Sequence, residues 1–126
     1  MTSDAVTSGS PTPVEQYTFC RIERGTLPAD LLHEDEQVIA FHDIAPRAPF
    51  HVLVVTRKHI ASLAETEDEA LLGHLVRVAA TLAKDAGFGE RGFRVQSNTG
   101  PEGGQDVFHL HWHVYAGRSL PPLPRA

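Results

Sequence analysis

Several classes of protein need residues that this chain of 126 residues has few of or lacks. Cysteine occurs once, at Cys20, so a fold held together by internal disulfides is excluded. No run of about 18 apolar residues is present, and we expect no membrane span. Residues 1–15 have neither the basic region nor the apolar core of a signal peptide, so we expect a cytoplasmic protein.

An excess of positive charge is missing as well. The chain has 11 Lys and Arg against 16 Asp and Glu, which gives a formal net charge of -5. Surfaces that bind nucleic acid or anionic membranes need basic patches, so we expect neither kind of partner. With 41% apolar and 21% charged residues, the composition is typical of a globular domain.

The hydrophobic pattern predicts one domain of the α+β class over residues 15–118, between a disordered tail at 1–14 and a C-terminal tail at 119–126. We expect an antiparallel sheet of about five strands, one main covering helix and a short N-terminal helix. The short helix is expected within 17–25 and the strands at 29–34, 37–44, 50–56, 93–98 and 108–115.

The main helix is expected to begin with a capping box, in which the Thr66 hydroxyl accepts a hydrogen bond from the backbone of Glu69. An apolar stripe follows at helical spacing, and Gly87 is the expected stop. His74 lies off this stripe, and the sequence gives it no role.

The segment 108–115 alternates strictly between apolar residues and histidine. On a strand this alternation puts His109, His111 and His113 on one face and apolar side chains on the other, whereas a helix would scatter the imidazoles. Imidazole changes charge near neutral pH, so one face of this strand is suited to chemistry.

The residue types leave three uses open: a metal site, a nucleophilic or acid–base site, and a structural cluster. His109 and His113 lie about 13 Å apart on an extended strand, so at most two of the three imidazoles could share an ion. A neutral imidazole can attack phosphorus while its neighbours donate to phosphate oxygens. On residue type alone His51 is expected to be structural, and Gly103-Gly104 is a weak signal for an anion-binding turn.

The segment His109-Leu110-His111-Trp112-His113-Val114-Tyr115 resembles the signature of the histidine triad (HIT) family, His-φ-His-φ-His-φ-φ with φ apolar. The resemblance covers about residues 19–118. It extends to the segments 27–29, 41–46, 48–49, 51–54, 58–60, 71–75 and 103–105 and to Asn98, which are similar to the Hint branch, the purine nucleoside phosphoramidases.

The resemblance implies an enzyme that hydrolyses adenosine or other purine nucleoside 5′-phosphoramidates, or acyl-adenylates, to the nucleoside monophosphate. His111 would be the nucleophile that takes the nucleotidyl group, with His113 and His109 orienting it and holding the phosphate. His51 would be the fourth active-site histidine, which reverses the structural interpretation. The implied nucleotide-binding residues are Phe19, Ile22, Phe41, His42, Asp43, Ile44, Asn98, Gly104, Gln105, Asp106 and Val107.

Within that set, the resemblance implies an apolar purine slot, ribose binding by Asp43, and phosphate binding by Asn98 and the backbone of residues 105–107. It also implies a homodimer in which the helix and a sheet edge pair to form one ten-stranded sheet, and it implies no cofactor.

Three departures from the family affect these expectations. Asp106 stands where close relatives often carry serine, and we expect the carboxylate to favour amine leaving groups. Some relatives bind a structural zinc through a Cys-x-x-Cys pair plus histidines, but Tyr17 replaces the first cysteine, so Cys20 and His59 cannot complete that site and no metal is expected. The proline-rich segment 120–124 differs from the tryptophan-containing tail of many relatives, and because that tail helps to select substrates, the sequence does not identify the natural leaving group.

Two alternative functions remain. One is a nucleotide-binding interaction module with little turnover, and the other is a metal-dependent hydrolase.

Overall fold

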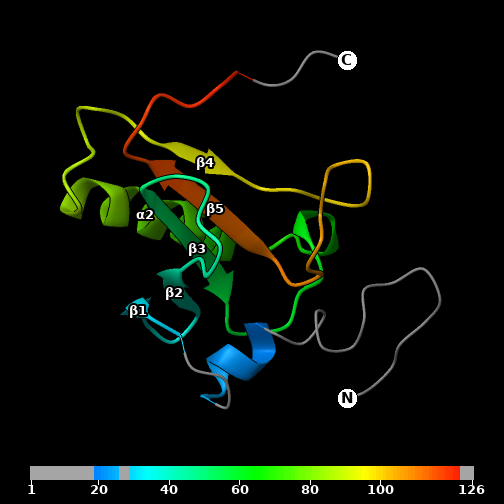
Figure 1. Ribbon diagram of the computed structural model, residues 1–126. Coiled ribbons are helices and arrows are strands. Elements are labelled where there is room, and N and C mark those ends of the chain that lie inside the picture. Colours follow the sequence, from blue (N-terminus) through cyan, green and yellow to red (C-terminus); the bar gives the residue numbers. More distant parts are fainter. Residues whose placement is uncertain (1–18, 26–28, 123–126) are drawn as a thin grey trace.

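The computed structural model describes residues 19–25 and 29–122; the predicted tail at 1–14 and residues 123–126 lie outside the described residues. After a short helix at 19–23 (Figure 1), the elements are β1 (Leu31–Glu34), β2 (Val38–His42), β3 (Phe50–Thr56), the 3-10 helix η1 (Leu63–Glu65), α2 (Glu69–Asp85), β4 (Arg94–Gln96) and β5 (His111–Ala116). Among the described residues, no helix is both long enough and apolar enough to cross a membrane.

The five strands form one sheet in the order β1-β2-β3-β5-β4, and every neighbouring pair is antiparallel. The predicted α+β class, with a five-stranded antiparallel sheet, one main helix and a short helix, is confirmed. β3 lies in the middle of the sheet and every one of its residues is buried. This explains why its sequence is apolar on both faces, since a central strand is covered from both sides.

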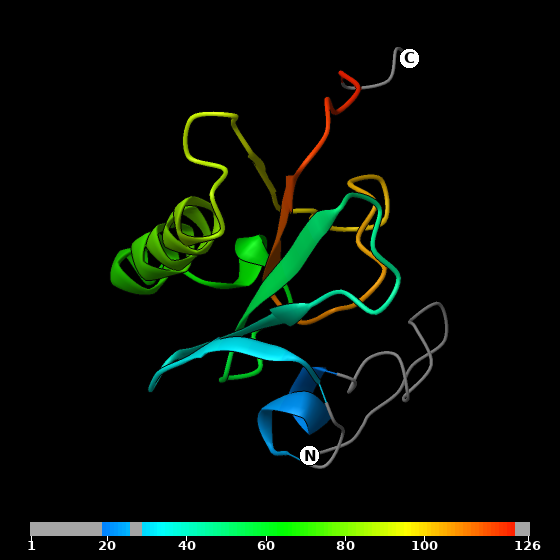
Figure 2. The same ribbon diagram turned by 60° about the vertical axis from the view of Figure 1, so that its left-hand side comes forward.

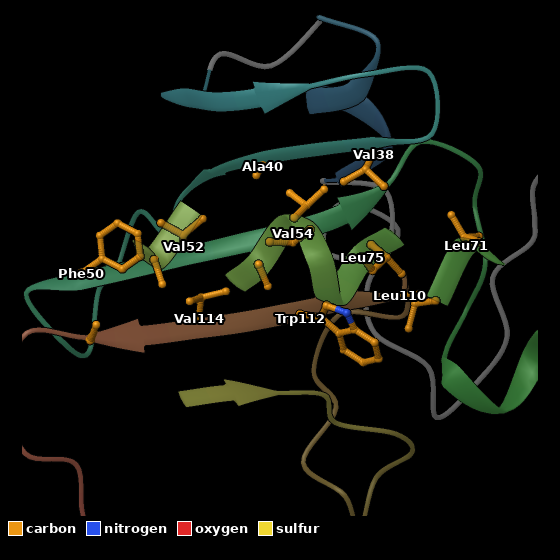
Figure 3. Packing of buried hydrophobic residues seen from close by; sticks show 14 residues of the cluster. Val38, Ala40, Phe50, Val52, Val54, Leu71, Leu75, Leu110, Trp112 and Val114 are labelled. Atoms are coloured by element: carbon orange, nitrogen blue, oxygen red, sulfur yellow. The ribbon is translucent and has the colours of Figure 1, made fainter. Parts of the chain in front are cut away.

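The two faces of the sheet carry different layers. Viewed nearly edge-on, α2 lies on one side, and the short helix and the loop between β4 and β5 lie on the other (Figure 2). Between α2 and the sheet, alternate residues of β3 and β5 pack with Leu71 and Leu75 of the helix (Figure 3). A second cluster on the opposite face contains Phe19, Ile39, Phe41, Leu53 and Val55.

The histidine strand is shorter than predicted. β5 begins at His111. The N–H of the preceding residue, Leu110, bonds at 2.6 Å to the carbonyl of Ile60, which lies after the end of β3 and outside the sheet. The predicted alternation still holds: Leu110, Trp112 and Val114 pack under α2. His109 and His111 face the other way, toward the ring of Phe19.

The predicted capping box at the start of α2 is wrong. Asp68 is the N-cap residue, and its carboxylate accepts from the Leu71 N–H at 3.0 Å. The Thr66 hydroxyl accepts instead from the Asp68 N–H at 3.2 Å, one step before the helix. The stop at Gly87 is confirmed: the helix ends at Asp85, and Gly87 takes a positive φ of 96° that favours glycine.

Candidate active site

A pocket of about 630 Å³ opens on the face of the sheet opposite α2. Its volume lies within the range of small-molecule sites. The short helix, β2, β3, β5 and the loops that precede β3 and β5 all contribute to its walls. The lining residues are Phe19, Ile22, Ala29, Asp30, Phe41, His42, Asp43, Ile44, Ala45, Arg47, Leu53, Asp106, Val107, His111 and His113.

The side chain of His111 lines this pocket although the residue is only 5% exposed. Its Nδ1 lies 2.6 Å from the His109 carbonyl oxygen. A carbonyl can only accept, so Nδ1 carries the proton and the lone pair of the neutral ring is on Nε2. None of the hydrogen bonds among the described residues uses that nitrogen.

Burial lowers the pKa of His111 below its ordinary value. The hydrogen bond to the His109 carbonyl and the negative charges of Asp106 and Asp43 oppose this effect without cancelling it. His111 is therefore neutral at pH 7, and its Nε2 lone pair is available as a base or a nucleophile.

A chain of hydrogen bonds fixes the protonation of His113. The Arg47 backbone N–H donates to Nδ1 of buried His51 at 3.1 Å, so the proton of His51 is on Nε2. That N–H points to Nδ1 of His113 at 3.0 Å, and the proton of His113 must then be on Nε2. The Asp43 carboxylate, 3.4 Å from Nε2 of His51, shares the same donor.

His113 therefore offers an N–H donor within the pocket wall. His51 does not line the pocket and holds the His113 ring in place through the hydrogen bond to its Nδ1. Burial is the main cause that lowers the pKa of His113, to about 4, and the neighbouring His111 and His51 add to it. Burial also lowers the pKa of His51, against the effect of Asp43. All three rings are neutral at pH 7, so together they offer one lone pair and one donor.

His109 does not line the pocket. Its Nε2–H donates to the Thr56 carbonyl at 2.6 Å, and its Nδ1 lies 3.4 Å from the Cys20 thiol. The thiol is also 3.2 Å from Nδ1 of His59. The donor atoms of Cys20, His59 and His109 lie within 4.8 Å of one another, which is one ligand short of a four-coordinate structural zinc site.

Hydrogen bonds between the side chains of Asn98 and Gln105 and backbone groups hold the glycine-rich turn before β5. Nδ2 of Asn98 donates to the Gly103 carbonyl at 2.7 Å, and the Gln105 side chain bonds Gly100, Ala61 and Val107. Gly104 has a φ of 82° that favours glycine. Asn98, Gly104 and Gln105 thus shape the loop without lining the pocket, whereas Asp106 and Val107 line it.

Sequence reasoning missed five lining residues: Ala29, Asp30, Ala45, Arg47 and Leu53. Arg47 is the chemically important one, since it brings a positive charge to a pocket predicted to hold phosphate. It lies in the proline-flanked loop 45–49, which has no periodicity. The signal available in the sequence was the position of Arg47, a positively charged residue just before the strand that carries His51.

Comparison with known proteins gives the same family as the sequence motif. The HIT domain model matches residues 24–120. An uncharacterized HIT-like protein of Synechococcus elongatus is 47% identical over 108 residues, covering 84% of this chain and 94% of its own. The purine nucleoside phosphoramidase of Escherichia coli is 39% identical over 111 residues, covering 86% and 93%.

Solved structures agree with the sequence comparison. A histidine triad protein from Clostridium difficile is 43% identical, with a TM-score of 0.81 over 85% of this chain and 95% of its own. A HIT family hydrolase from Legionella pneumophila is 39% identical, with a TM-score of 0.79 over 82% and 94%. With its fold, its histidine strand and these relatives in agreement, the chain belongs to the HIT domain family.

Proposed function

We propose that this protein hydrolyses purine nucleoside 5′-phosphoramidates or acyl-adenylates to the nucleoside monophosphate, through a nucleotidyl group held on His111. The state of His111 carries the proposal. The ring is neutral and held by its Nδ1–H, and it presents an unused Nε2 in the wall of a pocket of about 630 Å³. The name of the E. coli relative, purine nucleoside phosphoramidase, supports the substrate class.

In the first step, Nε2 of His111 attacks phosphorus and the bond from phosphorus to the leaving nitrogen or oxygen breaks. The nucleotidyl group is then bonded to Nε2 of a ring that keeps its Nδ1–H and carries a positive charge, and the leaving group departs with a proton taken from solvent. The Nε2–H of His113 and the side chain of Arg47 are suited to stabilise the charge that develops on the phosphoryl oxygens.

In the second step, a water molecule attacks phosphorus, its proton passes to solvent, and the bond to Nε2 breaks with the electron pair returning to that nitrogen. The nucleoside monophosphate is released, and the lone pair of His111 is restored. The rings of Phe19 and Phe41 and the side chain of Ile22 supply an apolar wall for the purine, and the Asp43 carboxylate suits the ribose hydroxyls as an acceptor.

The test is replacement of the nucleophile. His111→Ala should lower turnover of adenosine 5′-phosphoramidates by at least about a thousandfold, because it removes the nitrogen that forms the bond to phosphorus. A substrate radiolabelled in the phosphoryl group should label the wild-type chain at His111, with the acid lability and base stability of a phosphorus–imidazole bond. His33→Ala, at the sheet edge outside the pocket, is the matched control and should keep wild-type turnover.

Survival of most activity in His111→Ala would remove the nucleophile assignment. Binding of AMP without turnover of any phosphoramidate, acyl-adenylate or dinucleoside polyphosphate would favour an interaction module. Loss of activity in a chelator, together with bound metal after purification, would favour a metal-dependent hydrolase.

We also propose that the protein is a cytoplasmic homodimer. The free thiol of buried Cys20 suits a reducing compartment. Within the sheet that the structure describes, β4 is an edge strand with one side unpaired, and Val95 on it is 37% exposed. Val76 on α2 is 48% exposed, so the edge and the helix both offer apolar surface to a second copy.

A further inference from the structure

Two imidazoles and a carboxylate meet at the opposite edge of the sheet from β4, where the β1–β2 turn reaches α2. Nε2 of His33 lies 2.7 Å from Oδ2 of Asp35, and Nε2 of His74 lies 2.6 Å from the same oxygen. The three donor atoms lie within 4.8 Å of one another. None of the three residues lines the nucleotide pocket.

The topology brings these side chains together. His33 pairs with Ala40, whose side chain belongs to the cluster under α2, so the His33 side chain points to the helix side of the sheet. His74 precedes the fully buried Leu75 on α2 and stands at the margin of the buried stripe. His74, which had no role in the sequence, is therefore joined to the hairpin through Asp35.

Asp35 is held in place without the imidazoles. Its Oδ1 accepts from the N–H groups of Gln37 at 2.8 Å and Val38 at 2.9 Å, and its own N–H bonds to the Val38 carbonyl at 2.9 Å. The Arg57 guanidinium donates to its carbonyl. The carboxylate is thus fixed through one oxygen, which leaves Oδ2 directed at the two histidines.

Asp35 is also ionised. Burial acts to raise its pKa, but the hydrogen bonds from both imidazoles and two backbone amides hold the pKa well below its ordinary value. The side chains of Asp35, His33 and His74 are each 30–35% exposed, so water and ions reach the cluster from one side.

We propose that Nε2 of His33, Nε2 of His74 and Oδ2 of Asp35 form a binding site for a divalent transition metal, zinc being the best match. Two imidazole nitrogens and a carboxylate oxygen are the donors that zinc takes, and solvent on the open side supplies the fourth ligand. On binding, the proton on Nε2 of each neutral ring would be exchanged through solvent for one on Nδ1, which frees the Nε2 lone pair for the ion and replaces the two hydrogen bonds that now converge on Oδ2.

The required movement is small. Ligand atoms about 2 Å from a tetrahedral ion lie about 3.3 Å apart, so each nitrogen must withdraw from Oδ2 by roughly 0.6 Å. Imidazoles that are about one third exposed can make that movement by side-chain rotation, and the fixed carboxylate needs no movement. The bound ion would link β1, the β1–β2 turn and α2, which the two hydrogen bonds to Asp35 and the edge contact of the two imidazole rings now join.

The test is Zn²⁺ binding to the full chain in the Cys20→Ser background, measured by titration calorimetry. That background removes the thiol from the cluster of Cys20, His59 and His109. We expect about one equivalent of Zn²⁺ to bind, and His33→Gln or His74→Gln to weaken binding at least about tenfold, since even residues behind the ligands of a metal site contribute that much. Long-range ¹H–¹⁵N spectra should show the Nε2 signals of both histidines shifting with Zn²⁺.

Far-ultraviolet circular dichroism of each variant checks that it is folded, and the ¹H–¹⁵N spectra of the Cys20→Ser chain, which keeps both histidines, carry the test should one variant fail to fold. Absence of stoichiometric binding in the Cys20→Ser protein overturns the proposal, and the cluster is then a hydrogen-bonded clamp only. Binding that survives the loss of both His33 and His74 also overturns it, because the ion must then sit elsewhere.

Discussion

At the scale of single residues, the histidines of this chain differ through what binds each ring nitrogen. His111 has its proton fixed on Nδ1 by a carbonyl, whereas His113 has its proton fixed on Nε2 by the N–H of His51. One ring therefore presents a lone pair to the pocket and its neighbour presents a donor. Spacing in the sequence predicted a shared face for these imidazoles, but it carried no information on their tautomers, because the partners come from residues distant in the chain.

The acid limb of the pH–rate profile should follow the pKa of His111, because only the neutral ring has a lone pair that can attack phosphorus. The negative charge of Asp106 raises the pKa of His111 against the larger lowering by burial. Asp106→Asn removes that charge, so the pKa of His111 should fall further and the neutral form should persist to lower pH. We expect the acid limb of the kcat/KM profile, which lies below the ordinary histidine pKa of about 6.5, to move to lower pH.

Glu102→Gln is the matched control for Asp106→Asn, since it removes the same charge from the same loop outside the pocket. Its acid limb should coincide with that of the wild type, and ¹⁵N titration of the His111 ring should follow the kinetic shift in both variants. An acid limb that moves to higher pH in Asp106→Asn contradicts the assignment. Asp106→Ser tests the leaving group separately, and an unchanged ratio of rates on amine and anhydride substrates would remove that expectation.

At the scale of secondary structure, the sequence predicted which elements exist more reliably than where they begin. Strict alternation located the histidine strand, but β5 begins at His111 because Leu110 bonds to Ile60, a long-range pairing with no local signature. The Pro-flanked loop 45–49 was predicted only as irregular, yet Arg47 from it lines the pocket. Loops are positioned by tertiary contacts, so their chemistry is the part that sequence periodicity leaves out.

The start of α2 allows a direct comparison of two caps. Asp68→Ala removes the acceptor of the Leu71 N–H and should lower the free energy of unfolding by about 1 kcal/mol. Thr66→Ala removes an acceptor that lies before the helix, so its effect should be smaller. Urea unfolding at one protein concentration measures both, and a larger loss for Thr66→Ala would restore the capping box predicted from the sequence.

At the scale of the whole molecule, the two edges of the sheet differ. β1 borders the His33, Asp35 and His74 cluster and is tied to α2 through it. β4 is three residues long and leaves one row of backbone groups unpaired among the described residues. Val95 pairs with Val114, whose side chain packs under α2, so Val95 also points to the helix side. Val76 on α2 is exposed as well, so the edge strand and the helix each offer apolar surface to a second copy.

The proposed homodimer makes a prediction about Val95. In a two-fold symmetric pairing of β4 edges, an arginine at this position meets the same residue of the partner or lies close to it, and the like charges repel. We expect the wild-type chain to sediment at twice its mass of 13.8 kDa and Val95→Arg to move toward the monomer mass. Leu31→Arg places the same charge on the other edge strand, where Leu31 is 42% exposed, and should leave the dimer intact. A wild-type chain that sediments as a monomer, or a dimer broken by Leu31→Arg and not by Val95→Arg, would exclude pairing through β4.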